Sequence, residues 1–402
     1  MSKEINPAVP EPPLFEVSFR PFALGMATTI FALVGVVASL FGPLLVIFSQ
    51  RFHVSLPEAG VVLSVYFVGS CFGIVTGWLE VKRWAGKFVI AANLLFMAAG
   101  SVSAALSHGW LTFVASVLII GFGYGGLDLS LSTYLARTKS SGRTARFTLA
   151  IAGYGAGASI GPILIIALHP NRFPVLFAGI GALAVLLSTL SRGVHAPPFS
   201  AESMRRPNIA KAQRRPILVT FIFAFILYVA AEQGTSGWVA TQLHRIGYSE
   251  LVGSLVTAAF WGGMALGRVL ASSLPRRLSN EVVILGGLGI TVVLCAVATS
   301  SSLAPYAYSA EGLVLANVYP MAFIWYTRLC PHDDNGLALV LLLMMAGGII
   351  GPGAESLMVS LIGVHVVPVV IAVLALADLA VFASALRFRP PSVEGVSRAS
   401  HT

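Results

Sequence analysis

A carboxyl group and an amide interrupt a long apolar run in the stretch LYVAAEQGTSGW, which extends from Leu227 to Trp238. A charge at the centre of a bilayer costs at least about 2.5–3.5 kcal/mol, so an acid kept inside an apolar span is a functional candidate by default. The Glu232 carboxyl suits two kinds of chemistry: it can carry a proton, or it can accept hydrogen bonds from a polar solute. The structural alternative is a carboxyl that neighbouring hydroxyl groups satisfy inside the protein.

Helical spacing gathers polar and aromatic side chains around this acid. Residues four positions apart share one face of a helix, which places Tyr228, Glu232 and Ser236 in one row that suits a polar, ring-shaped solute. We predict that Glu232 binds and releases a proton. The substrate-facing residues that we predict in this span are Tyr228, Gln233, Ser236 and Trp238. Gly234 and Gly237 weaken helix continuity, and we predict a hinge at these two glycines.

A second acid, Asp128, lies within another apolar stretch, GYGGLDLSLSTYLA (123–136). Tyr124, Asp128 and Ser132 share a helical face by the same spacing. We predict that Asp128 assists in proton coupling and that Tyr124 contacts the substrate. The alternative for Asp128 is a structural charge pair near the inner end of its helix.

Arg268 is the only Lys or Arg that falls well inside a predicted span, away from its ends. We expect it to pair with Asp128, with Glu355 or with an anionic substrate, unless its long side chain reaches the phosphate groups of the membrane interface. Glu355 is accordingly predicted to belong to a charge pair or a gate. Glu311 is expected to be solvated near the outer interface, and Asn317 to line the substrate cavity.

These residues are carried by a very apolar chain. Of its 402 residues, 56% are hydrophobic and only 10% are charged, and the mean hydropathy is +0.86. A soluble domain carries roughly 25% charged residues, whereas segments long enough to cross a bilayer recur here. We therefore predict an all-α membrane protein with twelve transmembrane helices. Their expected ranges are 21–48, 57–79, 87–106, 110–136, 146–168, 173–191, 216–243, 250–274, 282–300, 305–327, 336–361 and 365–386.

The 25 Lys and Arg residues are distributed unevenly over the predicted loops. Only Arg51, Arg172 and Arg245 fall on one side, whereas the loops of the other side and the two terminal segments hold the rest, Arg268 excepted. An excess of basic residues in short loops marks the cytoplasmic side. We predict a multi-pass protein of the cell inner membrane with both termini in the cytoplasm. The net charge of +9 then reflects orientation, and no nucleic-acid partner is expected.

The two halves of the chain resemble each other weakly. In the second span of each half, two glycines four apart precede a basic pair, and the fifth span of each half contains G-x-x-x-G-P. Small residues four apart allow two helices to approach closely, so their recurrence at equivalent places indicates duplication of a six-helix unit. The glycines concerned are Gly69, Gly73, Gly157 and Gly161 in the first half and Gly263, Gly267, Gly347 and Gly351 in the second.

We divide the chain accordingly. Two six-helix bundles are predicted at 21–191 and 216–387, joined by a cytoplasmic linker at 192–215. Cytoplasmic tails are predicted at 1–20 and 388–402.

Two six-span halves, a basic central loop and G-x-x-x-G-P in the fifth span resemble the major facilitator superfamily. The superfamily's loop after span two usually reads G-x-L-x-D-R-x-G-R-K, and GWLEVKRWAGK (77–87) is similar to it, although Val81 stands where Asp is expected. Further stretches are similar to the fucose-permease-like branch, a branch of fucose–galactose–proton symporters, which usually has Asn where Ser132 stands. They are 123–136, YVAAEQGTSGWVATQL (228–243), GRV (267–269) and ANVYPMAF (316–323). The resemblance implies that the two halves rock about a central site.

We therefore expect a secondary active transporter that moves a small polar solute, by resemblance a sugar, through proton-coupled alternating access. The alternative is a proton-driven exporter of drugs or metabolites, because the span-five motif also resembles the superfamily's antiporter motif. A non-transporting membrane receptor is a third hypothesis, which the short loops disfavour. No Walker-type motif supports direct use of ATP. We expect no cofactor, no metal and no enzymatic activity; the expected partners are the solute, protons and the lipid bilayer, and we expect a monomer.

Overall fold

The computed structural model describes residues 21–136, 143–191, 211–273, 278–330 and 334–388. The predicted N-terminal tail, most of the linker and residues 389–402 of the C-terminal tail lie outside the described residues. The first helix of the second half begins at Lys211, within the predicted linker range.

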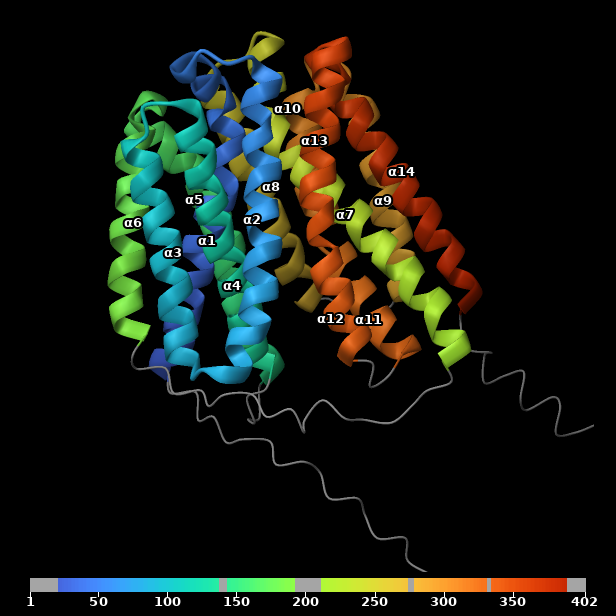
Figure 1. The fold of residues 1–402 in the computed structure, drawn as a ribbon. Helices are drawn as coiled ribbons and strands as arrows, with labels where there is room; N and C mark the ends of the chain where they lie inside the picture. Colours follow the sequence, from blue (N-terminus) through green and yellow to red (C-terminus); the bar gives the residue numbers. More distant parts are fainter. Residues whose placement is uncertain (1–20, 137–142, 192–210, 274–277, 331–333, 389–402) are drawn as a thin grey trace, which may run out of the picture.

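The first half consists of six long helices, with a short 3₁₀ turn, η1 (Pro170–Arg172), before the last (Figure 1). They are α1 (Pro21–Phe52), α2 (Leu56–Arg83), α3 (Gly86–Leu106), α4 (Trp110–Ala136), α5 (Arg143–Leu168) and α6 (Phe173–Leu190). Each coincides with one predicted span to within a few residues.

The second half contains eight helices and two 3₁₀ turns, η4 (Val364–Val366) and η5 (Leu386–Phe388), among the described residues. The helices are α7 (Lys211–Arg245), α8 (Glu250–Ser273), α9 (Asn280–Ala298), α10 (Ala304–Leu315), α11 (Val318–Leu329), α12 (Asp334–Leu343), α13 (Met345–Ile362) and α14 (Val367–Ala385). The tenth and eleventh predicted spans are thus each made of two helices. Ten of the described helices are long and apolar enough to cross a membrane.

A proline explains the break in the tenth span. Pro320 has no N–H to donate to the carbonyl of Ala316, so the regular helical hydrogen bond is missing there. The chain turns at Ala316 and Asn317, between the end of α10 and the start of α11. The unbonded Ala316 carbonyl then needs a partner from elsewhere in the protein.

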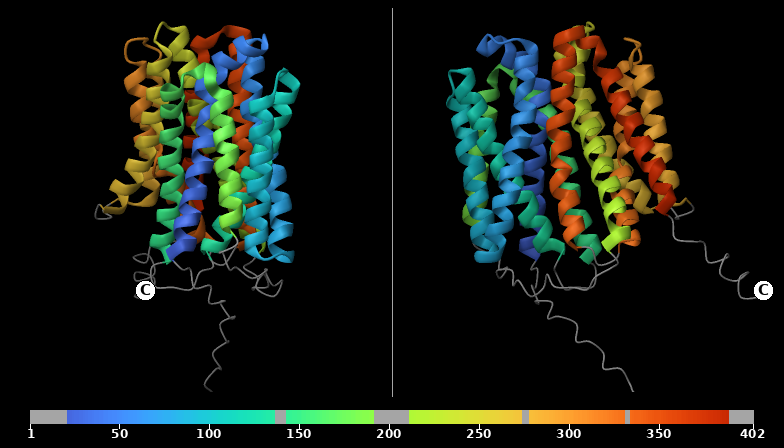
Figure 2. Two further views of the ribbon diagram at one scale, coloured as in Figure 1. Left: turned by 90° about the vertical axis from the view of Figure 1, so that its left-hand side faces the viewer. Right: turned by 45° about the vertical axis from the view of Figure 1, so that its right-hand side comes forward.

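The helix packing repeats between the halves. In the first half α1 packs against α5, α2 against α4 and α3 against α6; in the second half α7 packs against α13, α8 against α10 and α9 against α14. The halves meet through α2 with α13 and through α8 with α5. These two contacts are equivalent, because α2 corresponds to α8 and α5 corresponds to α13. Figures 1 and 2 show the two bundles side by side, with α1 beginning and α14 ending on the same side, called the inner side below. The predicted fold class, two pseudo-symmetric six-helix bundles, is confirmed.

The recurring glycines lie where equivalent helices touch. A Cβ at Gly73 would overlap the Phe122 carbonyl of α4, and one at Gly267 would lie 2.5 Å from the Ala316 Cβ beyond α10. In the fifth spans, a Cβ at Gly157 would overlap α1, and one at Gly351 would overlap α7. These glycines allow the backbone-to-backbone approach that the spacing predicts.

We predict that Gly157→Ala destabilises the protein by about 1–3 kcal/mol, the usual cost of overpacking, because the new methyl group would overlap the Ala32 carbonyl oxygen. The matched control is Gly286→Ala in α9, where a Cβ would meet nothing within 4 Å. Thermal unfolding of both variants in the same detergent measures the difference. Equal unfolding temperatures for the two variants would contradict this role of Gly157.

Candidate functional site

The helix that carries Glu232 is enclosed by the rest of the protein. Every residue of α7 from Tyr228 to Leu243 is buried. Gly42 of α1 lies against the backbone of Ser236 and Gly237, so the first half contacts α7 directly. Because water is excluded around such a helix, its polar side chains must be satisfied by protein groups or by a polar cavity.

Glu232 is held by residues of its own helix and faces a cation. The Tyr228 hydroxyl donates a hydrogen bond to Glu232 Oε1 at 3.2 Å, and Gln233 Nε2 lies 3.5 Å from Oε2. Arg268 of α8 is close enough for its charge to act on the Glu232 carboxyl. The row of Tyr228 and Glu232 is therefore present, with a positive charge opposite it.

Arg268 is fixed by the break in the tenth span. Its Nε donates to the Ala316 carbonyl at 3.3 Å, the carbonyl that Pro320 leaves without a helical partner. In return, Asn317 Nδ2 donates to the Gly267 carbonyl at 3.1 Å. These two bonds tie α8 to the α10–α11 turn and position the guanidinium. The Asn317 amide, predicted to line the cavity, is used in this structural bond.

Glu232 was not among the predicted partners of Arg268. The charge of Arg268 acts on Glu232, and its predicted pairing with Asp128, with Glu355 or with an anionic substrate stays a prediction. The charge next to Glu355 is a second acid, Glu311. Sequence spacing misses Glu232 because α8 presents Arg268 to α7, a relation that spacing does not contain.

Tyrosines from both halves connect Asp128 with Glu232. Tyr154 of α5 and Tyr319 of α11 each lie within the field of both carboxyl groups and of Arg268. The side chain of Tyr124, one turn from Asp128, lies beside that of Tyr154. The two acids, one from each half, therefore share one tyrosine-lined region.

Aromatic rings line this region on both sides of Glu232. One turn inward of Glu232, the Tyr228 and Tyr319 rings lie 6.2 Å apart between centroids. The Tyr154 ring meets that of Trp261 edge-on at 5.7 Å, and Trp261 Nε1 donates to Ser236 Oγ at 2.9 Å, one turn outward of Glu232. A ring contact between the two halves therefore lies outward of Glu232.

Two predicted substrate contacts lie in packing positions in this conformation. Ser236 accepts the Trp261 bond, and Trp238 is fully buried with its Nε1 donating to the Pro352 carbonyl at 3.3 Å. The predicted hinge glycines lie in an unbroken helix. The space beside Gly234 is occupied by the Glu355 carboxyl and that beside Gly237 by Leu63, so both glycines serve close packing here.

The outer halves of α2 and α13 form a seam between the two bundles. Ser356 Oγ donates to the Pro57 carbonyl at 2.6 Å, and Ser64 Oγ donates to the Ile349 carbonyl at 2.9 Å. We call the stretch of α2 and α13 between these two contacts the outer seam. Trp238 packs into it, against Gly60.

Exposure increases on the other side of the site. Asp128, Tyr154, Arg268 and Tyr319 are all partly exposed, whereas Trp261, further outward, is buried. Asp128 therefore keeps some exposed surface, whereas Glu232 is buried.

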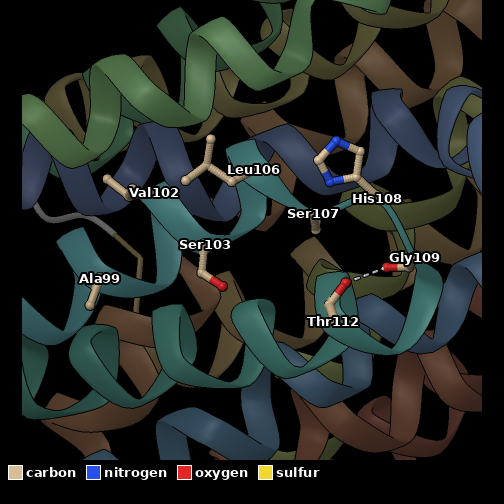
Figure 3. Close-up of a pocket in the computed structure, with 8 residues that line it drawn as sticks. All are labelled: Ala99, Val102, Ser103, Leu106, Ser107, His108, Gly109 and Thr112. Atoms are coloured by element: carbon tan, nitrogen blue, oxygen red, sulfur yellow. Dashed lines mark hydrogen bonds between the residues drawn. The ribbon is translucent and has the colours of Figure 1, made fainter.

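A surface pocket lies elsewhere, at the outer end of the α3–α4 hairpin (Figure 3). Its lining includes Ser103, His108 and Thr112, whose Oγ1 bonds the Gly109 carbonyl. None of the predicted site residues belongs to it, so it is separate from the central region.

Several residues of the site were not predicted. Tyr154, Trp261 and Tyr319 supply rings, and the only signals for them were aromatic residues beside a glycine motif or a proline. Glu311 was expected to be solvated, which is wrong: its side chain is fully buried and accepts a hydrogen bond from Thr235 Oγ1 at 2.9 Å. Glu311 is buried because neighbouring helices cover its side chain, although it lies close to the end of its predicted span.

The fold and the central polar region define a membrane transporter built from two six-helix halves. Residues 27–338 match the family model of the Major Facilitator Superfamily, and the chain belongs to that superfamily. It is accordingly a multi-pass membrane transporter and not an enzyme.

Individual relatives agree with this assignment. A glucose/galactose transporter of Brucella abortus biovar 1 (strain 9-941) is 24% identical over 372 residues, which cover 86% of this chain and 89% of the relative. The solved structure of a bacterial homolog to the human lysosomal transporter Spinster, inward-facing and unoccupied, covers 93% of this chain and 100% of its own at 13% identity, with a TM-score of 0.75. The E. coli fucose:proton symporter FucP covers 93% and 100% at 17% identity, with a TM-score of 0.64. The two structures show the fold alone.

A double-mutant cycle tests whether the Ser236–Trp261 bond is structural. We predict that Ser236→Ala costs more stability in the wild-type background than in Trp261→Phe, by about 0.6 kcal/mol, a typical coupling between membrane helices. Unfolding of the four proteins in one detergent measures the coupling energy. A coupling of zero would return Ser236 to the predicted role of a substrate contact alone.

Proposed function

We propose that this protein is a proton-coupled sugar transporter of the cell inner membrane that works by alternating access. The observation that carries the proposal is that Tyr154 and Tyr319 each interact with both Asp128 and Glu232, one acid from each half. A site made by both halves changes its access when the halves rock. The glucose/galactose transporter relative supports a sugar as the solute.

The chemistry of the central region suits a sugar. Tyr154, Tyr228, Tyr319 and Trp261 offer flat apolar faces with polar edges, which match a ring that is apolar on its faces and hydroxylated on its rim. Asp128 supplies acceptors for sugar hydroxyls. We infer that these rings orient the sugar and that its hydroxyls bond to the acids and to the tyrosine hydroxyls.

Glu232 is the proposed proton carrier, assisted by Asp128. Charge interactions are stronger in a water-poor site. Protonation of Glu232 therefore weakens its attraction to Arg268 by more than it would in water. When the proton leaves Glu232, the carboxylate and Arg268 attract each other; when it binds, Arg268 is freed to interact with the solute or with Asp128. Proton binding and solute binding are thereby coupled through Arg268.

The proposed access route follows the observed seam. Contacts at Pro57–Ser356 and Ser64–Ile349 hold the two halves together on the outer side. Asp128 and Arg268 are partly exposed, and we infer that solute reaches them from the inner side. We infer an inward-open state of a monomer with both termini in the cytoplasm. The outward-open state requires the outer seam to separate.

The alternative function is a proton-driven exporter of drugs or metabolites. The G-x-x-x-G-P segment at Gly157 packs on α1, and the same motif in the superfamily's antiporters favours this alternative. Export and uptake differ in the direction of accumulation, so a transport assay separates them.

We predict that proteoliposomes containing the protein and loaded with unlabelled glucose or galactose accumulate the labelled sugar transiently by counterflow. Empty liposomes are the control for leakage. No counterflow with any hexose or pentose tested, together with efflux of an amphiphilic dye driven by a proton gradient, would favour the exporter.

We predict that Glu232→Gln loses proton-driven sugar accumulation at least tenfold while it keeps counterflow, because the amide still accepts hydrogen bonds but carries no proton. The matched control is Asp378→Asn, an equally buried acid of α14 outside the site, which should keep both activities. Full accumulation by Glu232→Gln at every pH tested would contradict the proton role.

A further inference from the structure

Two acids contact α7 at the neighbouring residues Gly234 and Thr235. Glu311 of α10 and Glu355 of α13 have no exposed surface, and they lie close enough for their charges to repel. Thr235 Oγ1 donates to Glu311 Oε1 at 2.9 Å. A Cβ at Gly234 would lie 2.9 Å from Glu355 Oε1 and 3.0 Å from Oε2, so this glycine leaves room for the second carboxyl.

The pair lacks both hydrogen-bond partners and a cation. Among the described residues, Glu311 Oε2 and both Glu355 oxygens are buried without a partner. The other titratable groups that interact with the pair are Tyr308 of α10, whose hydroxyl donates to Gln242, and Cys295 of α9. Among the described residues, no titratable group of α2, α8 or α14, Asp378 of α14 included, acts on either carboxyl.

Such a pair cannot carry two negative charges. Two carboxylates close enough for their charges to interact repel each other, and burial without a cation disfavours each charge further. A proton on one carboxyl removes the repulsion and turns that group into a donor. The donor then satisfies an oxygen of its neighbour, which accounts for acceptor atoms that otherwise have no partner.

The pair is separate from Glu232. Successive residues of a helix are rotated by about 100°, so Gly234 points about 160° and Thr235 about 60° away from the direction of Glu232. Glu355 therefore contacts the back of α7 and Glu311 contacts a face next to that of Glu232. The charge that acts on Glu232 is that of Arg268, not that of either acid.

The pair also lies directly beside the outer seam. Glu355 is one residue from Ser356, which bonds Pro57 across the seam, and three residues from Pro352, which accepts the Trp238 bond. Repulsion between Glu311 and Glu355 would displace α13 from α10 and α7, and with it these two seam contacts.

We propose that Glu311 and Glu355 form a second proton-binding site, in which the two carboxyls share one proton while the outer seam is closed. The proton leaves for water on the outer side when the seam opens, and the two carboxylates then repel each other. The link to the seam rests on the alternating access proposed above, whereas the shared proton does not.

Infrared spectroscopy in lipid tests the shared proton without any substrate. Subtracting the neutral-pH spectrum of Glu311→Gln/Glu355→Gln from that of the wild type should leave the band of a protonated carboxyl, which shifts in D₂O. The control uses proteins that all carry Asp378→Asn. Subtracting the spectrum of Glu311→Gln/Glu355→Gln in this background from that of Asp378→Asn alone should leave the same band. The absence of this band would overturn the proposal whatever the protein transports.

Spin labels across the outer seam test its consequence. Val61 of α2 and Leu357 of α13 are both exposed, at 44% and 56%, and accept labels once Cys71, Cys295 and Cys330 are replaced by alanine. The label–label distance should be short at neutral pH and lengthen at alkaline pH in the wild type and in Asp378→Asn. In Glu311→Gln/Glu355→Gln it should stay short throughout.

A double variant that lengthens like the wild type would overturn the role in the seam, because other acids would then drive opening. If the double variant fails to insert, Glu355→Gln alone gives the same test, since one amide already removes the repulsion between like charges. If the wild-type protein transports no sugar but shows the carboxyl band, the result counts against the proposed function and leaves the proposed proton pair in place.

Discussion

A helix enclosed on all sides within a membrane must have each of its polar groups satisfied by protein or by a polar cavity, and α7 is the helix on which this constraint falls. From Tyr228 to Leu243 it is buried at every position, although it carries Glu232, Gln233, Thr235 and Ser236. The partners of these groups come from α8, α10 and the helix itself. The arrangement of the second bundle is largely the solution to this requirement.

The same constraint explains the break between α10 and α11. Pro320 leaves one carbonyl without its helical partner, and Arg268 takes the place of the missing N–H. A residue that would otherwise be a costly buried cation is thereby held opposite Glu232. The close approach that allows this bond depends on Gly267, since any side chain there would collide with Ala316. One proline, one glycine and one arginine together position the charge of the central site.

Much of the fold was predictable from the sequence because hydrophobicity along the chain is a one-dimensional signal. The span predicted at 110–136 is α4, Trp110–Ala136, and the glycine repeat marked the helix pairs that touch. The partners of individual charges were not predictable, because they depend on how helices distant in the sequence are rotated toward one another. Arg268 acts on Glu232, which was not among its predicted partners, and Glu311 is buried because α7 and α13 cover it. The roles of the predicted site residues remain predictions.

The central claim is that Asp128 and Glu232 share one solute site that opens to the inner side. Accessibility of Ser132→Cys, one turn inward from Asp128, tests it most directly in a background in which the three native cysteines are replaced. A charged thiol reagent applied from the inner side should modify this cysteine, and galactose should slow the reaction. Ser64→Cys in the outer seam should not react from that side. Modification of Ser132→Cys from the outer side only, or at a rate that no sugar changes, would contradict the account.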